Sequence, residues 1–171
     1  MLDVVRVTSE QDYQEALRIR RLVFVEEQGV PAALEVAGEY ERKATYFLVS
    51  LHGQAIGTGR FRMAGPTVKF ERIATLKEAR GQGAAAALMR VMQAEAAREL
   101  PRHLRYMHAQ DSAVPFYHKL GWRAVGEPFS EAGIYHRIMV LVPATRLDFE
   151  ALLCWSEPGA IPAAVLAEIA G

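Results

Sequence analysis

The stretch KEARGQGAAAALM, residues 77–89, places Arg80, Gly81 and Gly83 within four positions and follows them with a run of alanines. Glycine allows a tight turn and admits a ligand where a Cβ atom would intrude. A helix that begins there points several unpaired N–H groups at whatever lies in front of it. Pyrophosphate is the natural ligand, because several donors act together with the positive end of the helix and Arg80 adds a flanking charge. Taken alone, the pattern is also typical of an ordinary tight connection.

Two known nucleotide-binding patterns do not match this loop. A P-loop needs Lys followed by Ser or Thr after its second glycine, and neither pair follows Gly83. The dinucleotide fingerprint needs a third glycine where this chain has Ala86, and the preceding strands look like a hairpin rather than part of a βαβ unit. Any anion that binds here is therefore expected to do so through a different motif.

Strand patterns and helix patterns follow one another in mixed order, which predicts an α+β fold with helices interleaved among mostly antiparallel strands. His52-Gly53 is expected to form a hairpin turn. The predicted strands are VVRV, ATYFLVSL, QAIGTGRFR, residues 67–76, HLRYMHAQ, AVGEPF and YHRIMVLV.

Three stretches predict helices. Ser9 is expected to cap the first, which ends near Glu27 and is followed by a loop over residues 28–41. Residues 84–100 carry apolar side chains at helical spacing and continue from the glycine loop. The stretch SAVPFYHKLGW predicts a short helix that Ser112 caps.

Composition limits the classes of function. The chain has 171 residues, of which 51% are hydrophobic, and this suits a soluble domain with a substantial core. Twenty basic and twenty acidic residues give no global electrostatic case for a nucleic acid or a membrane surface as partner. The single cysteine, Cys154, cannot form an internal disulfide, and the first residues lack the pattern of a signal peptide, so we expect a cytoplasmic protein.

The runs IATLKEARGQGAAAALM and SAVPFYHKLGW resemble the GNAT superfamily of acyl-CoA-dependent N-acetyltransferases. The signature of that superfamily is Arg or Gln, two residues, Gly, one residue, then Gly or Ala, and Arg80, Gly83 and Ala85 fit it. LRIRRLVFVEEQGVP, GTGRFR, HAQDSAVPFYHKLGW and EPFSEAGIYHRIMV together resemble its ElaA-like branch. We therefore expect residues 1–142 to form the acyltransferase domain and residues 143–171 to be an appendage packed on the core or at an interface.

The resemblance implies α/β/α layers around a mixed, mostly antiparallel central sheet with a splayed strand pair. It also implies acetyl-CoA as co-substrate: the strand before the loop pairs its backbone with the pantetheine arm, and the loop amides hold the pyrophosphate. The implied contacts are Ile73, Ala74 and Thr75 on the strand, Arg80, Gly81, Gln82, Gly83, Ala84, Ala85 and Ala86 in the loop, and Phe116.

The implied reaction transfers an acetyl group to a primary amine of a small molecule or a protein, by direct attack in a ternary complex. An acyl-CoA-binding sensor or interaction module of the same fold, without turnover, is the alternative. Tyr117 stands where the superfamily commonly has its general acid. With pKa values of about 10 for Tyr and about 8.5 for a thiol, protonating the thiolate is uphill by roughly 2 kcal/mol. The other interpretation of Tyr117 is a packed residue at the end of an amphipathic helix.

Glu71 and His108 are candidates for the general base, because we expect them on adjacent strands. Strand alternation would put Glu71, Ile73 and Thr75 on one face. His has a suitable intrinsic pKa, near 6.5, whereas Glu would need burial to raise its value. The alternatives are a structural role for His108 and an ion pair of Glu71 with Arg62 or Lys69.

Glu26, Glu27 and Gln28 follow the end of the first helix and could bind a cationic amine, or could simply be solvated. The five histidines lack metal-ligand spacing, so no metal is expected. Partners are expected to be the amine acceptor and a second copy of the chain in a homodimer, with no nucleic acid and no membrane.

Overall fold

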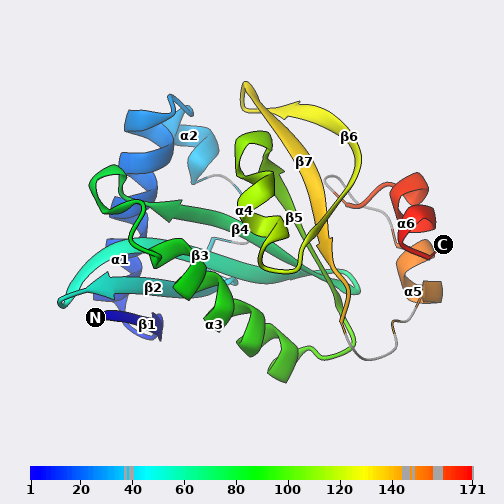
Figure 1. The fold of residues 1–171 in the computed structure, drawn as a ribbon, viewed down its shortest axis with the longest axis horizontal. Coiled ribbons are helices and arrows are strands. Elements are labelled where there is room, and N and C mark those ends of the chain that lie inside the picture. The colour runs from blue at the N-terminus through cyan, green and yellow to red at the C-terminus, as the bar shows by residue number, and fades with distance from the viewer. Residues whose placement is uncertain (37, 39–40, 144–146, 148, 156–159, 171) are drawn as a thin grey trace. The chain divides into compact units, whose positions relative to one another are not determined.

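The structure is a computed structural model that describes all residues except 37, 39–40, 144–146, 148, 156–159 and 171 (Figure 1). Its described residues form one seven-stranded sheet in the order β1-β2-β3-β4-β5-β7-β6. The β4–β5 pair is parallel, whereas β1–β2, β2–β3, β5–β7 and β6–β7 are antiparallel. The predicted mixed, mostly antiparallel α+β fold is confirmed. The strands are β1 (Leu2–Arg6), β2 (Thr45–Leu51), β3 (Gln54–Ala64), β4 (Thr67–Thr75), β5 (Leu104–Gln110), β6 (Arg123–Glu131) and β7 (Ile134–Leu141).

Helices α1, α3 and α4 lie in the three predicted stretches. Ser9 caps the first helix by accepting a hydrogen bond from the N–H of Asp12 at 3.1 Å, as predicted. The helices are α1 (Glu10–Arg20), α2 (Ala32–Glu35), α3 (Ala84–Glu99), α4 (Val114–His118), α5 (Phe149–Leu153) and α6 (Ala163–Ala170), with a π-helix η1 (Arg21–Glu27) and two 3-10 turns, η2 (Lys77–Ala79) and η3 (Asp111–Ala113).

Two local predictions about helices were wrong. Residues 28–41 are not all loop, because α2 lies within them. Ser112 does not cap α4, because it lies inside the turn η3, and Ala113 holds the cap position without a side-chain hydrogen bond. Proline in the first turn of α4 has a fixed φ that suits the start of a helix.

Positive φ angles close the β2–β3 and β6–β7 hairpins. His52 and Gly53 have φ angles of 51° and 80°, and Ala132 and Gly133 have φ angles of 52° and 76°. Two successive left-handed residues match the twist of antiparallel strands, so the predicted hairpin at His52-Gly53 is confirmed.

The chain divides into two compact units. Unit 1 comprises Met1–Arg62 and Glu71–Glu95, and unit 2 comprises Met63–Phe70 and Ala96–Gly171. The core of unit 1 contains Ala16, Ile19, Val23, Phe47, Val49, Leu88, Met89 and Met92, all at most 3% exposed. Burying each large apolar side chain stabilises the fold by about 1.5–3 kcal/mol.

The C-terminal segment contributes to the core of unit 2. Its members in that core are Leu147, Leu152, Ile161, Val165 and Leu166, which pack with Ala64, Leu104, Tyr106, Val125, Ile138 and Val140. Among the described residues, no helix is long and apolar enough to cross a membrane.

Candidate functional site

The glycine loop joins β4 to α3 through the turn η2. Gly81 and Gly83 have φ angles of 79° and 83°, in the left-handed region where a Cβ atom causes strain. The backbone alone therefore favours glycine at both positions. The N–H of Ala87 donates to the carbonyl of Gly83 at 3.0 Å, so the N–H groups of the three preceding alanines come before the first helical hydrogen bond of α3.

The space beside both glycines is open to a ligand. A Cβ atom at Gly81 would have no heavy atom within 4 Å among the described residues, and one at Gly83 would meet Cδ1 of Leu2 at 3.9 Å. Gln82 between them is exposed. These residues therefore fit a diphosphate without displacing a side chain, and their role as phosphate contacts stays a prediction.

Arg80 and Glu27 form a bidentate ion pair beside this loop. Nη1 and Nη2 of Arg80 lie 2.6 Å and 2.8 Å from the two carboxylate oxygens of Glu27, and Nε donates to the carbonyl of Thr75 at 3.1 Å. The hydrogen bonds from Arg80 lower the pKa of Glu27. A diphosphate would compete with Glu27 for Arg80. The acceptor-binding role predicted for Glu27 and its neighbours Glu26 and Gln28 stays a prediction.

A bulge at Arg72 breaks the alternation of β4. Arg72 has a φ of 56° within the strand. Ile73 lies beside Gly59, because a Cβ atom at Gly59 would be 3.3 Å from Cγ1 of Ile73. Glu71 instead contacts the side chain of Arg60, which points to the other face of β3. The expectation that Glu71 shares a face with Ile73 and the later residues of β4 is therefore wrong, because the left-handed residue reverses the alternation.

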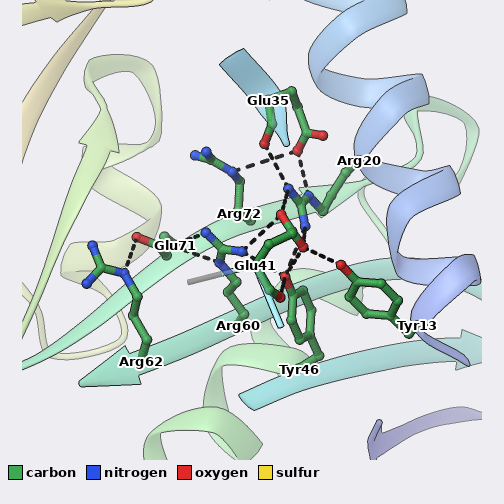
Figure 2. Close-up of polar contacts among 9 residues, drawn as sticks. All are labelled: Tyr13, Arg20, Glu35, Glu41, Tyr46, Arg60, Arg62, Glu71 and Arg72. Atoms are coloured by element: carbon green, nitrogen blue, oxygen red, sulfur yellow. Dashed lines mark hydrogen bonds and ion pairs between the residues drawn. The ribbon is translucent and has the colours of Figure 1, made fainter. Parts of the chain in front are cut away.

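Glu71 belongs to a polar cluster of unit 1, which we call the arginine cluster (Figure 2). Nε of Arg60 donates to Oε2 of Glu71 at 2.7 Å, and Nε of Arg62 donates to Oε1 at 3.2 Å. The ion pair with Arg62, the alternative to a base role for Glu71, is present. A base must take up a proton, and protonation of Glu71 would weaken both ion pairs. The members of the cluster are Tyr13, Arg20, Glu35, Glu41, Tyr46, Arg60, Arg62, Glu71 and Arg72.

Glu41 is the centre of the arginine cluster. Arg20 donates to its two carboxylate oxygens at 2.8 Å and 2.9 Å, the hydroxyl of Tyr13 donates at 2.7 Å, and the hydroxyl of Tyr46 also donates. Burial raises the pKa of Glu41, but the hydrogen bonds from Arg20, Tyr46 and Tyr13 outweigh it and lower the pKa to about 2. The carboxylate is therefore ionised at neutral pH and ties α1 to β2 and β3.

In unit 2, His108 of β5 contacts Glu131 of β6. Nδ1 of His108 lies 3.1 Å from Oε1 of Glu131, and the imidazole is 11% exposed. The hydrogen bond from His108 lowers the pKa of Glu131 to about 2, against the effect of burial. An ionised carboxylate only accepts hydrogen bonds, so Nδ1 of His108 carries the hydrogen. In the neutral imidazole, Nε2 is then the ring atom with a free electron pair, as a general base requires.

His136 lies on the other side of the same carboxylate. Its Nε2 is 3.7 Å from Oε2 of Glu131, and its Nδ1 lies 2.7 Å from the carbonyl of Ile134. Since a carbonyl only accepts, Nδ1 of His136 carries the hydrogen. Among the described residues, no three or more His, Cys, Asp or Glu side chains form a group that could hold a metal ion.

Tyr117 lies on α4 and is 8% exposed. Burial raises its pKa well above the usual value, so the phenol stays protonated at neutral pH. Proton transfer to a thiolate is then more costly than for an ordinary tyrosine. Phe116 packs edge-on against it, with 5.0 Å between the ring centroids. The roles of Tyr117 as general acid and of Phe116 as a cofactor contact stay predictions.

The pairing of β4 with β5 covers only the first part of β4. It runs from Thr67 with Leu104 to Phe70 with Met107, whereas β4 continues to Thr75. His108 directly follows the last paired residue of β5.

The structure distributes the predicted site residues over the two units. Unit 1 holds the strand, loop and acceptor candidates together with Glu71, and unit 2 holds His108, Phe116 and Tyr117. Glu131 was not predicted, because its contact with His108 joins residues that are 23 positions apart. The signal that could have found it is an acid at the end of one hairpin strand, with a histidine in the facing strand.

Residues 9–143 match the family model described as acetyltransferase (GNAT) domain. The chain is 37% identical over 140 residues to the uncharacterized protein YyaT of Bacillus subtilis, covering 81% of this chain and 94% of that protein. It is 35% identical over 140 residues to the uncharacterized N-acetyltransferase YjcF of the same organism, covering 81% of this chain and 99% of that protein.

Solved structures share the fold. An acyl-CoA N-acyltransferase from Pseudomonas aeruginosa matches with a TM-score of 0.70 at 25% identity, over 83% of this chain and all of that chain (100%). ElaA of Escherichia coli matches with a TM-score of 0.71 at 21% identity, over 82% of this chain and 99% of that chain. Because residues 9–143, which are most of this chain, match the family model, the chain belongs to the acetyltransferase (GNAT) domain family.

Proposed function

We propose that this protein transfers an acetyl group from acetyl-CoA to a primary amine of a small molecule or a protein, by direct attack in a ternary complex. The observation that carries the proposal is the glycine loop, with two left-handed glycines, open space beside them and a helix start immediately after. This combination suits a diphosphate. Membership of the acetyltransferase family supports an acyl thioester as the donor.

Acetyl-CoA supplies the acetyl group as a thioester. The N–H groups of the loop from Gly81 to Ala86 would bind its pyrophosphate, and the backbone of Ile73, Ala74 and Thr75 would bind its pantetheine arm. A strand N–H near Ala74 would also stabilise the oxyanion that forms on the thioester carbonyl, because a backbone donor is already fixed in place.

His108 is the better of the two candidates for the general base. Its Nε2 has a free electron pair, because Glu131 accepts the hydrogen of Nδ1 at 3.1 Å. Glu71 already accepts from Arg60 and Arg62. We therefore assign proton removal from the attacking amine to Nε2 of His108, either directly or through one water molecule.

Tyr117 would return a proton to the departing thiolate. The C–S bond breaks as the new C–N bond forms, and the phenol proton gives free coenzyme A. Burial keeps Tyr117 protonated up to high pH, so the proton is present, but its transfer costs more than from an ordinary tyrosine. A nearby positive charge, or a hydrogen bond donated to the phenol oxygen, would offset the unfavourable pKa difference.

The test is a thiol-release assay with acetyl-CoA over a panel of primary amines, with the product amide identified by mass spectrometry. We expect release of coenzyme A to equal formation of amide for at least one class of amine. If acetyl-CoA raises the melting temperature but no amine releases thiol, the chain is an acyl-CoA-binding module instead. If ATP stabilises it as strongly as acetyl-CoA does, the loop binds phosphates without acyl chemistry.

A further inference from the structure

Arg72 is the guanidinium of the arginine cluster with the weakest internal pairing. Arg20 donates to Glu35 at 2.5 Å and to Glu41 at 2.8 Å. The contact of Arg72 is between Nε and Oε1 of Glu35, at 3.7 Å, which is too long for a hydrogen bond. Its buried Nε has no hydrogen-bond partner among the described residues.

The surroundings of Arg72 do not offset the loss of hydration. Burial opposes the positive charge of Arg20 and of Arg60, but their carboxylate partners outweigh it and raise the pKa of both groups. For Arg72 burial dominates and lowers the pKa, although a guanidinium remains charged at any pH at which proteins fold. An additional anion would remove this imbalance.

The backbone conformation that positions the side chain of Arg72 costs free energy. A non-glycine residue in the left-handed region costs roughly 1–2 kcal/mol, and Arg72 has a φ of 56°. The resulting bulge brings its side chain to the arginine cluster, where alternation would have turned it away. Strain of this kind is concentrated at binding sites.

The outer end of the guanidinium remains accessible. The side chain is 31% exposed, whereas that of Arg20 is 0% exposed. In Figure 2 the terminal nitrogens of Arg72 point away from Glu35 and from the other labelled residues. Two parallel N–H groups in a planar fork match the two oxygens of a carboxylate.

We propose that Arg72 binds the carboxylate of the acceptor, so that the preferred substrates are amines that also carry a carboxylate, such as an amino acid. This specificity rests on the proposed function. Arg72 directly precedes Ile73, Ala74 and Thr75, the predicted strand contacts of acetyl-CoA. An acceptor bound to Arg72 is therefore separated from those contacts by only a few residues of β4. A singly charged carboxylate suits this weakly paired guanidinium better than a phosphate dianion, because the negative charge of Glu35 lies close by.

The kinetic test compares amino acids with their carboxamides, which have the same amine but no carboxylate. In the wild type we expect kcat/KM to be at least about 10-fold higher for the amino acid. Arg72→Gln should abolish this preference and leave the carboxamide rate within about twofold. Arg90→Gln, at an exposed position of α3, should keep the preference. A wild type without the preference, or an Arg72→Gln variant that retains it, would overturn the proposal.

A binding test separates this inference from the proposed function. Calorimetric titration of the same amino acid without acetyl-CoA should show binding to the wild type and loss of binding in Arg72→Gln, even if no amine releases thiol. If Arg72→Gln does not fold, Arg72→Lys keeps the charge without the fork and should weaken amino-acid binding about 10-fold. Equal binding by Arg72→Lys would contradict bidentate recognition, and tighter binding of a phosphorylated amine would assign the site to phosphate.

Discussion

At the scale of single residues, the hydrogen bond between His108 and Glu131 decides how the proposed chemistry can run. It fixes the hydrogen on Nδ1, because the ionised carboxylate can only accept. A positioned carboxylate also stabilises the imidazolium that forms when Nε2 takes a proton, as in catalytic triads. Glu131 therefore acts through His108 and is a positioning residue.

Glu131→Gln tests this role. We expect kcat for amine acetylation to fall about 10- to 100-fold, because the hydrogen-bond partner of His108 is no longer an anion. The exposed Glu127 of the same strand provides the control, and Glu127→Gln should leave kcat unchanged. In a His108→Gln background Glu131→Gln should have no further effect. An equal loss in both backgrounds would show that Glu131 does not act through His108.

Tyr117→Phe tests the general acid. Its hydroxyl makes no hydrogen bond to any other described residue, so we expect the variant to fold with an unchanged melting temperature and to lose about 100-fold in kcat. Tyr135→Phe removes a hydroxyl from a side chain that is 70% exposed and should retain activity. Full turnover by Tyr117→Phe would assign this residue to packing.

The sequence could predict some of these residues and not others. Tyr117 and His108 follow from a motif and from a strand pattern, which are local. Glu131 meets His108 across 23 positions, and this contact depends on how β5, β6 and β7 assemble. The bulge at Arg72 could not be predicted, because arginine has no preference for the left-handed region that it occupies.

At the scale of elements, the caps and turns that begin or end helices and strands were the most predictable part of the fold. The cap at Ser9, the hairpin at His52-Gly53 and the loop at Gly81 and Gly83 rest on side chains or glycines that act within a few residues. Ser112 failed as a cap because a 3-10 turn competes with a capped start for the same residues. Such a choice depends on packing around the helix.

Gly65→Ala tests how the C-terminal segment packs on the turn between β3 and β4. Gly65 has a φ of 57°, and a Cβ atom there would lie 2.2 Å from Nε1 of Trp155. We expect a loss of unfolding free energy of about 3 kcal/mol, from backbone strain and overpacking together. Gly53→Ala has similar strain without a neighbour within 4 Å and should cost about 1 kcal/mol. In a Trp155→Ala background the cost of Gly65→Ala should approach that of Gly53→Ala; equal costs in both backgrounds would contradict the contact.

At the scale of the whole molecule, a formal net charge of zero conceals strongly paired local charges. The arginine cluster joins residues from α1 to β4, far apart in the sequence, around Glu41. Single-sequence patterns predicted α1 and the strands β2, β3 and β4, which carry most of these residues. They could not predict the cluster, because its members pair across elements.

Acid titration tests how much Glu41 stabilises the fold. The pKa of Glu41 is lowered from 4.5 to about 2, so its contribution is present above pH 4.5 and is lost as the pH falls through about 2. A shift of this size corresponds to about 3 kcal/mol. Glu41→Gln should lower the unfolding free energy at pH 7 and reduce its fall between pH 4.5 and 2, as measured by urea unfolding. The exposed Glu78→Gln should change neither. A Glu41→Gln variant as stable as the wild type at pH 7 would contradict this account.

Calorimetric titration of acetyl-CoA tests the central claim, that the glycine loop binds the diphosphate of the donor. We compare the wild type with Gly83→Ala and with Gly53→Ala, since Gly83 and Gly53 have φ angles of 83° and 80°. We expect the wild type and Gly53→Ala to bind acetyl-CoA equally and Gly83→Ala to bind at least about 10-fold more weakly, a loss of about 1.4 kcal/mol. No binding to the wild type, or equal binding by Gly83→Ala, would contradict the claim.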